Sequence, residues 1–571
     1  MNSPGRNVYR SAQRTIVRLW WITALALALA ALCAAQTPQF ERGRNGMVVT
    51  SEKHASAAGL AVLKSGGNAV DAAVAAAFAL AVTHPAAGNI GGGGFLLVRL
   101  AGGETNFIDF REQAPLAATE DMYLGPDGKP TQDSVIGWRA AGVPGTVRGL
   151  ELAHRRYGKL AWKDVAAPAV KLARDGFALS AAQARSLNGS RLLAQFPESR
   201  RIFQRNGTAW SEGDVLKQPE LAQVLERIAA AGAQDFYEGE TARRLADAMR
   251  AHGGLITLED LRRYRAVERA PLSGGYKGYT ILSAPPPSSG GAGLLQVLGV
   301  LAGTGYEKSG PGSAPTIHYV AEALRRFFAE RGEFLGDPDF ERLPVAGLLD
   351  PRHLDRLRRS IDPERATPSR SLRAGAPLFE APETTHLTAV DRAGNAAALT
   401  YTLNGSFGSG VTVPGLGFLL NNEMDDFSVQ PGFPNSAGLV QGRVNAIRAG
   451  KRPLSSMTPT IVLKDGQFFL ALGSPGSGRI ISSVLQVLLN VIDHRMPLAE
   501  AVAYPRFHHQ WLPDRLYVEP GFRIETLRKL EAMGHAVEQT RGIGEVQAVW
   551  LNGGWLEGVA DPRGEGAAGG Y

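Results

Sequence analysis

The segment TTHLTAVDRAGNAAALTYTLN, residues 384–404, predicts a β-hairpin and opens a β-rich part of the chain. Apolar side chains alternate with polar or small ones over 384–390 and 396–403, with turn residues at 391–395 between the two runs. Alternation with a period of two residues indicates strands, and a short turn between two such runs indicates a hairpin. We therefore expect an antiparallel sheet built around this segment.

Helical patterns lie on both sides of this β-rich part. In residues 55–82, small and apolar residues recur at helical spacing around Gly66 and Gly67, which predicts two closely packed helices. This order of elements predicts an α+β fold in which helices cover the outer faces of two sheets. Strands are also expected at 90–100, 106–110, 459–464 and 467–473, and helices at 145–176, 218–263, 293–303, 315–335, 479–494 and 523–534.

The overall composition is that of a globular protein. The chain has 571 residues, of which 44% are hydrophobic and 20% charged, which excludes a disordered tail, a coiled coil and a multi-span membrane protein. Four arginines and no acid in residues 1–35 reduce the net charge of the remainder from +7 to +3. No basic cluster indicates a nucleic-acid partner, and the pair Arg325-Arg326 is expected on a solvated helix face.

Residues 1–35 have the layout of a secretory signal peptide. A basic stretch ends at Arg18, an apolar run covers 19–32, and small residues follow up to Ala35, after which we expect cleavage. The apolar run of roughly 14 residues is shorter than the ~20 needed to span a bilayer, so an uncleaved membrane anchor is the less favoured alternative. A periplasmic or secreted protein is expected. Its only cysteine, Cys33, lies in the leader, which excludes disulfides and thiolate chemistry after cleavage.

Several common catalytic and metal-binding signatures are missing. The sequence has no HExxH, SxxK, GxSxG or P-loop pattern. The glycines at 91–94 are interpreted as a strand packed closely against a helix. His508 and His509 are adjacent, so on a strand they would point to opposite faces. Asp425-Asp426 lacks the other ligands of a calcium loop. We expect neither a metal nor an organic cofactor.

Thr384 stands directly after a stretch, 361–383, that contains four prolines and is expected to be an exposed loop or linker. A threonine at the start of a strand usually has a structural role, because β-branched residues favour strands. A cut before Thr384 would give it a second role. The new α-amine, with a pKa of roughly 7.7–8.0, could take the proton of the threonine hydroxyl, so that one residue holds nucleophile and base.

Eight motifs distributed over nearly the whole chain resemble γ-glutamyltranspeptidases. The resemblance implies a four-layer αββα sandwich of the N-terminal nucleophile hydrolase type. It also implies self-cleavage between Glu383 and Thr384 into a large subunit, 36–383, and a small subunit, 384–571, that stay associated. The motifs are GGNAVDAA (66–73), FREQAP (110–115), PPPSSGG (285–291), the hairpin segment (384–404), LLNNEMDDFS (419–428), KRPLSSMTPTIV (451–462), FHHQWLP (507–513) and ADPRGEGAAGGY (560–571).

The resemblance also implies the chemistry. Thr384 would attack the side-chain amide of a γ-glutamyl compound such as glutathione, and the resulting ester would pass to water or to an amino acid or peptide. A bidentate guanidinium suits the substrate α-carboxylate, and backbone amides suit the oxyanion. The implied roles are Arg111, Ser455 and Ser456 for the α-carboxylate, Glu423, Asp426 and Asn404 for the α-ammonium, Thr402 for the nucleophile, and the amides of Gly476 and Ser477 for the oxyanion.

Three positions depart from the family pattern. Glu423 stands where some members have Gln, and both side chains can accept a hydrogen bond from an ammonium. Ser477 stands where the family often has glycine, so a position that needs a positive φ would be mildly strained. Residues 431–446 resemble the lid loop of the family, and Ala437 stands where bacterial relatives often have an aromatic gate. A looser cover would favour hydrolysis over transfer.

Two alternatives remain at this point. A glutaryl acylase of the same family, acting on cephalosporin side chains, would not need Glu423 and Asp426, because a glutaryl group has no α-ammonium. A non-catalytic periplasmic protein that binds γ-glutamyl peptides would not need Thr384 and Thr402. The presence of all four residues favours the transpeptidase.

Overall fold

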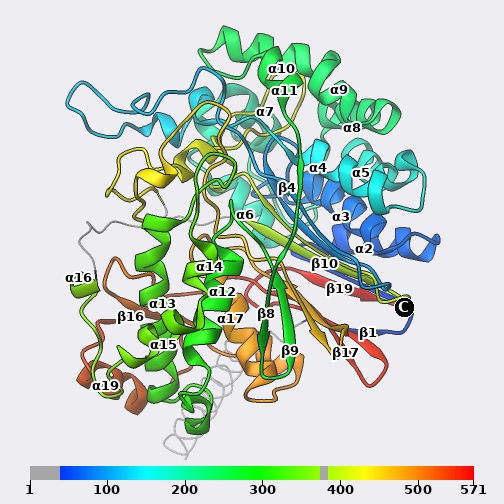
Figure 1. Ribbon diagram of the computed structural model, residues 1–571. Helices are drawn as coiled ribbons and strands as arrows, with labels where there is room; N and C mark the ends of the chain where they lie inside the picture. The colour runs from blue at the N-terminus through cyan, green and yellow to red at the C-terminus, as the bar shows by residue number, and fades with distance from the viewer. Residues whose placement is uncertain (1–38, 373–383, 437) are drawn as a thin grey trace, which may run out of the picture. The chain divides into compact units, whose positions relative to one another are not determined.

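The hairpin that begins at Thr384 lies at the centre of a seven-stranded antiparallel sheet. A computed structural model describes residues 39–372, 384–436 and 438–571, so the expected signal peptide and residues 373–383 of the expected linker lie outside the described residues. The strand order is β19 (Ala567–Gly570), β2 (Gly46–Thr50), β10 (Thr385–Asp391), β11 (Ala396–Thr402), β3 (Gly93–Arg99), β4 (Thr105–Phe110) and β7 (Val267–Arg269). Figure 1 labels β19, β10 and β4 of this sheet.

A second antiparallel sheet, also of seven strands, contains the other predicted hairpin. β12 and β13 pair on either side of Asp465 and Gly466, as their alternating pattern predicts. The strand order is β1 (Gln39–Gly43), β18 (Trp555–Ala560), β17 (Gln547–Asn552), β13 (Gln467–Gly473), β12 (Thr460–Lys464), β9 (Tyr279–Ser283) and β8 (Leu272–Tyr276).

Alternating side chains of the first sheet enter two different cores. Met47 and Val49 of β2 join the core shared with the second sheet, whereas Val48 joins the core under the helices. A Cβ placed on Gly558 of β18 would lie 2.4 Å from Met47 Sδ, so the two sheets pack face to face. Helices α2 (Lys53–Lys64), α3 (Ala69–Thr83), α4 (Thr146–Tyr157) and α5 (Trp162–Asp175) cover the first sheet, and α12 (Gly290–Leu301), α13 (Ala314–Phe334) and α17 (Arg479–Ile492) cover the second. The layers form the expected αββα sandwich.

The two helices predicted in 55–82 are α2 and α3. Asn68 caps α3, and its side chain accepts hydrogen bonds from the backbone amides of Val70 and Asp71. Every residue of α3 is buried, and its alanines let neighbouring backbone approach closely. A Cβ on Gly59 of α2 would lie 3.0 Å from the carbonyl oxygen of Ala72. Small side chains at this contact therefore determine how closely the two helices pack.

Several predictions need correction. α12 begins at Gly290, three residues before the predicted start. Ser369–Leu372 forms a short helix, α16, within the predicted linker, and residues 373–383 lie outside the described residues. The glycines at 91–94 do allow close packing, but against strands rather than a helix: a Cβ on Gly94 would lie 2.4 Å from the carbonyl oxygen of Thr400. The region 218–263 contains α8 (Pro219–Ala231), α9 (Ala233–Glu238), α10 (Glu240–Ala251) and α11 (Leu258–Arg263).

Within the described part of the chain, no helix has the length and apolar character needed to cross a membrane.

Candidate active site

Thr384 lies at the first position before β10, and the hairpin places it opposite the end of β11. β10 and β11 pair Thr385 with Tyr401, which brings Thr384 next to Thr402. The Thr384 hydroxyl donates to Thr402 Oγ1 across 3.4 Å, a long hydrogen bond between two buried side chains. Thr402 Oγ1 also accepts from the backbone amide of Asn404 at 2.8 Å. The predicted nucleophile and its predicted partner are therefore in contact.

Asn404 turns the chain from β11 toward the acidic segment. Its φ of 77° is in the left-handed region, which asparagine tolerates better than most residues. Its side chain donates to the carbonyl oxygen of Asn422 at 3.1 Å, and the Asn422 side chain accepts from the amide of Gly405 at 2.9 Å. These bonds fix the chain between the hairpin and Glu423.

Arg111 follows β4 and joins two segments that are distant in the sequence. It is 1% exposed. One terminal nitrogen donates to Glu423 and the other to Asp426 Oδ2 at 2.5 Å, and both acids belong to a single 3-10 turn, Glu423–Asp426. Its Nε donates to the carbonyl oxygen of Pro453 at 3.2 Å, just before Ser455. We call Arg111, Glu112, Glu423 and Asp426 the Arg111 pocket.

The Arg111 pocket holds more carboxylates than one guanidinium can satisfy. Burial raises the pKa of Glu423 well above its ordinary value, although Arg111 opposes the shift. Burial also raises the pKa of Glu112 to about 7, with Arg111 Nη1 3.6 Å away. Burial disfavours the charged form of Arg111, but Glu423, Asp426 and Glu112 together raise its pKa. Adjacent sites of both signs can bind a zwitterion.

Ser455 and Ser456 are held by the PPPSSGG segment. The amide of Ser455 donates to the carbonyl oxygen of Pro287 at 2.8 Å, and the amide of Ser289 donates to the carbonyl oxygen of Ser455 at 2.8 Å. Ser456 Oγ accepts from Arg331 Nη2 at 3.1 Å. The predicted carboxylate-binding serines therefore lie on a fixed segment that Arg111 also contacts.

Gly476 and Ser477 lie in the turn between β13 and α17. A Cβ on Gly473 would lie 2.3 Å from the ring of His386, so the end of β13 packs directly on β10 close to Thr384. Among the described residues, the amides of Gly476 and Ser477 donate no hydrogen bond, and neither residue bonds to Thr384 or to the Arg111 pocket. Ser477 has a φ of 50°. Ser477 therefore adopts the left-handed conformation in which a serine is expected to be mildly strained.

The segment that resembles the lid loop is fastened to the acidic turn. The Asn435 side chain donates to Asp426 Oδ1 at 3.1 Å, and the amide of Ser436 donates to Asp425 Oδ2 at 3.0 Å. The Gln441 side chain donates to the carbonyl oxygen of Asp426 at 2.9 Å. Ala437, the position of the predicted missing gate, lies outside the described residues.

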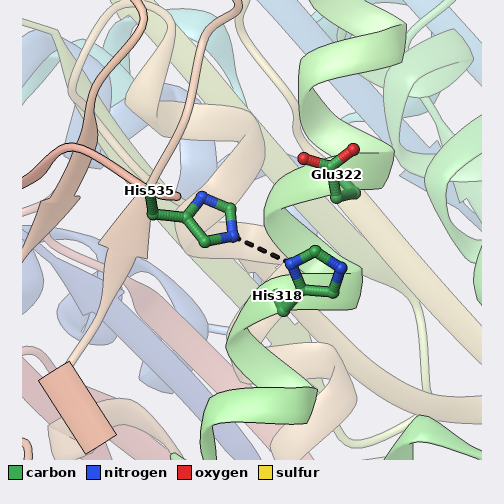
Figure 2. A group of neighbouring side chains, drawn as sticks. All are labelled: His318, Glu322 and His535. Carbon is green, nitrogen blue, oxygen red and sulfur yellow. Dashed lines mark hydrogen bonds between the residues drawn. The ribbon is translucent and has the colours of Figure 1, made fainter. Parts of the chain in front are cut away.

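Three further ionisable side chains form a group that could hold a metal ion (Figure 2). His318 and Glu322 of α13 and His535 place one ligand atom each within 4.8 Å of one another. His318 Nδ1 and His535 Nε2 share a hydrogen bond of 2.9 Å, and Glu322 accepts from Arg325 Nε at 3.1 Å and Arg326 Nη1 at 2.6 Å. These two arginines occupy the carboxylate and add positive charge, so a cation is a poor fit. We call these five residues the Glu322 cluster.

The Glu322 cluster corrects one prediction. Arg325 and Arg326 are each 2% exposed and pair with Glu322, instead of lying on a solvated face. His508 and His509 contact different partners, as their opposite directions predict. His508 hydrogen-bonds to the hydroxyl of Ser482 at 2.6 Å, whereas His509 Nδ1 accepts from the amide of Trp511 at 3.1 Å.

Sequence reasoning missed three residues of the site. Glu112 carries a buried carboxylate beside Arg111, Asn422 fixes Asn404, and Arg331 bonds to Ser456. Glu112 stands inside the FREQAP motif, so its position was available as a signal. Arg331 stands in a helix rich in charge, where its burial could not be distinguished from the exposure expected for its neighbours.

The sandwich and the site define the class of protein. The crystal structure of a cephalosporin acylase from Bacillus halodurans superposes with a TM-score of 0.81 at 26% identity, over 93% of this chain and 97% of that one. The fold is that of the N-terminal nucleophile hydrolases.

Sequence comparison narrows the class to one family. The family profile described as Gamma-glutamyltranspeptidase matches residues 55–571. A glutathione hydrolase proenzyme from Escherichia coli is 49% identical over 528 residues, covering 91% of each chain. An acylase ACY 1 proenzyme from a Pseudomonas strain is 39% identical over 536 residues, covering 92% of this chain and 93% of the other. The chain belongs to the γ-glutamyltranspeptidase family.

Proposed function

We propose that this protein is a γ-glutamyltranspeptidase and glutathione hydrolase that cuts itself before Thr384 and then uses Thr384 as its nucleophile. The observation that carries the proposal is the contact between Arg111, Glu423 and Asp426, next to a hairpin that begins with the Thr384–Thr402 pair. A zwitterionic γ-glutamyl head needs one cation and at least one anion at neighbouring sites, and a threonine nucleophile needs a positioned hydroxyl.

Self-cleavage needs no other nucleophile. The Thr384 hydroxyl attacks the carbonyl carbon of Glu383, and the peptide bond is replaced by an ester to Thr384 Oγ1. The C–N bond breaks in this step, and its nitrogen takes the hydroxyl proton to become the Thr384 α-amine. Water then hydrolyses the ester, which frees the Glu383 carboxylate and restores the Thr384 hydroxyl. The hydrogen bond to Thr402 Oγ1 supports this role because it orients the hydroxyl before and after the cut.

Turnover repeats the same chemistry on the substrate. The α-amine of Thr384 takes the hydroxyl proton while Oγ1 attacks the γ-carbonyl carbon. The amides of Gly476 and Ser477 stabilise the tetrahedral oxyanion, where one donor is typically worth ~10²–10³ in rate. The amine leaving group takes the proton and departs, leaving a γ-glutamyl ester that water or an acceptor amine resolves.

Substrate binding exchanges partners within the Arg111 pocket. In the substrate-free protein Arg111 pairs with Glu423 and Asp426. The substrate α-carboxylate would take up Arg111 together with the hydroxyls of Ser455 and Ser456. Its α-ammonium would take up the two acids, with Asn404 assisting. Because the zwitterion brings one charge of each sign, binding leaves the net charge of the buried site unchanged.

The acylase alternative uses the same nucleophile on a different head group. The acylase relative shows that both activities occur in close relatives. A glutaryl donor has no ammonium, so Glu423 and Asp426 would face it as uncompensated anions. The direct contact of Glu423 and Asp426 with Arg111 places anionic and cationic groups side by side. A γ-glutamyl donor, which has both an α-ammonium and an α-carboxylate, matches this arrangement better than a glutaryl donor.

The proposed subunits, 36–383 and 384–571, share both sheets. In the first sheet β2 of the large subunit lies between β19 and β10 of the small one, and in the second β1 lies beside β18. The four strands β18, β17, β13 and β12 of the small subunit lie between strands of the large one. This arrangement supports subunits that stay associated after the cut. We also propose export to the periplasm or the cell exterior, on the leader pattern.

Intact mass spectrometry under denaturing conditions tests the proposal. The expected result is two chains, the lighter beginning at Thr384, together with release of glutamate from glutathione. Thr384→Ala should give one uncut chain without activity, and Thr385→Ala, the matched neighbour, should still be cut. An uncut but active wild-type protein would contradict the nucleophile assignment. An uncut and inactive protein that binds γ-glutamyl peptides would favour the binding protein.

The balance between hydrolysis and transfer is a separate part of the proposal. If Ala437 leaves the site loosely covered, glutamate should exceed γ-glutamyl-glycylglycine at low glycylglycine concentration. Predominant dipeptide under those conditions would contradict the hydrolysis bias.

A further inference from the structure

Arg331 of α13 is a buried cation that has no carboxylate partner in the described part of the chain. Its side chain is 2% exposed. Among residues 39–372, 384–436 and 438–571, no carboxylate lies within ion-pair distance of it, and its hydrogen bonds go to two hydroxyls, Ser289 Oγ at 2.9 Å and Ser456 Oγ at 3.1 Å. Burial lowers its pKa to about 10, which nearby Asp426 opposes and Arg111 reinforces. A buried guanidinium is costly to keep without a counter-ion.

The hydrogen bonds of Arg331 have only one possible direction. A guanidinium has five N–H donors and no acceptor, so both serine oxygens must accept from it. The Ser289 hydroxyl proton then goes to the carbonyl oxygen of Ser455, 2.8 Å away. The Ser456 hydroxyl proton must point away from Arg331. Arg331 therefore controls both the position of the 455–456 segment and the donor direction of Ser456.

We infer that Arg331 is a positioning residue for the substrate α-carboxylate: it fixes the Ser456 hydroxyl as a donor and supplies a second positive charge behind the serines. The inference rests on the proposed γ-glutamyl donor. In the proposed complex, Arg111 contacts the carboxylate directly, and Arg331 acts through Ser289, Ser455 and Ser456. The carboxylate provides the counter-charge that Arg331 lacks in the substrate-free protein.

Three donors separate this role from general stabilisation. A γ-glutamyl anilide has both α-groups, a glutaryl anilide keeps the carboxylate without the ammonium, and a 4-aminobutyryl anilide keeps the ammonium without the carboxylate. For the self-cleaved Arg331→Met protein, we expect KM to rise at least tenfold for the two donors with a carboxylate. We expect kcat to change less than threefold, and KM for the 4-aminobutyryl donor to stay within twofold of wild type.

Two further variants test the route through the serines. Arg331→Met combined with Ser456→Ala should raise KM no more than the stronger single change, because both remove the same interaction. Ser289→Ala keeps the Arg331 cation and removes only the hydrogen bond between Arg331 and residue 289. It should therefore raise KM less than Arg331→Met does, again only for the two donors with a carboxylate. If Arg331→Met does not self-cleave, KM for the three donors is compared between wild type and the variants Arg331→Lys and Ser289→Ala instead.

Arg326→Met is the matched control, because Arg326 lies on the same helix with the same 2% exposure and pairs with Glu322. It should lower thermal stability and leave the order of the three KM values unchanged. An equal rise in KM for all three donors in the Arg331 or Ser289 variants would overturn the inference, as would fully multiplicative effects in the double variant. A wild-type protein that turns over no γ-glutamyl anilide would instead refute the proposed function.

Discussion

The Arg111 pocket and the Glu322 cluster are both built from buried arginines and carboxylates, but they differ in how completely their polar atoms are bonded. Glu322 accepts through both oxygens, from Arg325, Arg326 and the amide of Thr367. In the Arg111 pocket, neither oxygen of Glu112 and only one of Glu423 has a hydrogen-bond partner among the described residues.

We interpret this difference as one between a structural cluster and the proposed binding site. An unbonded buried carboxylate oxygen costs free energy, which a ligand can recover by supplying the missing donor. The unpartnered nitrogen in the Glu322 cluster, His535 Nδ1, belongs to an imidazole whose pKa burial lowers to about 3, so that it stays uncharged. Residue types alone do not distinguish the two groups, whereas the hydrogen bonds of their carboxylates do.

The largest effect is expected from a substitution that disrupts the Arg111 pocket. Arg111→Met removes the direct carboxylate ligand and leaves Glu423 and Asp426 uncompensated. We expect kcat/KM for a γ-glutamyl anilide to fall by three to four orders of magnitude, about 4–5.5 kcal/mol. Steady-state kinetics on protein already cut before Thr384 measures this. A loss smaller than tenfold would mean that Arg111 is structural, like Arg326.

The second largest effect is expected from a substitution that disrupts the Glu322 cluster. Glu322→Gln leaves Arg325 and Arg326 without their shared charge, which should lower the free energy of unfolding by about 3 kcal/mol. Thermal or denaturant unfolding of the two proteins at equal concentration measures this loss. KM should stay within twofold of wild type. A large rise in KM with unchanged stability would reverse the assignment of the two groups.

The third prediction is that Glu112 and Glu322 contribute to the free energy of unfolding with opposite dependence on pH. Burial raises the pKa of Glu112 to about 7 from 4.5, so its contribution to stability is present below pH 4.5 and is lost as the pH rises through 7. Compared with wild type, Glu112→Gln should gain about 2–3 kcal/mol of stability between pH 4.5 and 8.

Glu322 should behave in the reverse sense. Burial alone would raise its pKa, but Arg325, Thr367 and Arg326 lower it. Its contribution is therefore present above pH 4.5 and is lost as the pH falls through the lowered value. Unfolding of Glu112→Gln from pH 4.5 to 8, and of Glu322→Gln as the pH falls below 4.5, each relative to wild type, checks both signs. Parallel curves for the two variants would show that the pocket is as fully bonded as the cluster.

The smallest effect concerns the turn after β13. Ser477 has a φ of 50°, which glycine adopts with less strain. Ser477→Gly should raise the free energy of unfolding by about 0.5–1 kcal/mol and keep kcat, because the backbone amide is retained. Ser474→Gly in the same turn, where φ is not positive, is the control and should not stabilise. A drop in kcat for Ser477→Gly would show that the serine side chain takes part in the chemistry.

Sequence patterns predicted much of the fold because the decisive elements have strong local signals. The hairpin at 384–403 alternates along both strands, and the helices within 55–82 have caps and small residues at regular spacing. Strands such as β17 and β18 were missed. The first three residues of β17 and the last five of β18 are all buried, so their sequences show no clear alternation. The short helix α16 was missed because prolines dominate the composition around it.

The residues of the candidate site were predicted from motifs. The ion pairs and hydrogen bonds between them could not be predicted in this way. Ten residues were named from the resemblance, and the structure brings Thr384 to Thr402 and Arg111 to Glu423 and Asp426. Whether a buried charge is paired depends on side chains hundreds of positions away, such as Arg111 and Asp426. For that reason the burial of Arg325 and Arg326, and the unpaired Arg331, appeared only in three dimensions.

The sharing of both sheets between residues before and after the cut has a consequence for reversibility. Before the cut, one chain closes every strand pairing within itself, so refolding is unimolecular. After the cut, neither product holds a complete sheet, and recovery from full unfolding requires two molecules to meet and interleave their strands. The uncut precursor can therefore repair an unfolding event, whereas the mature protein depends on the height of its unfolding barrier.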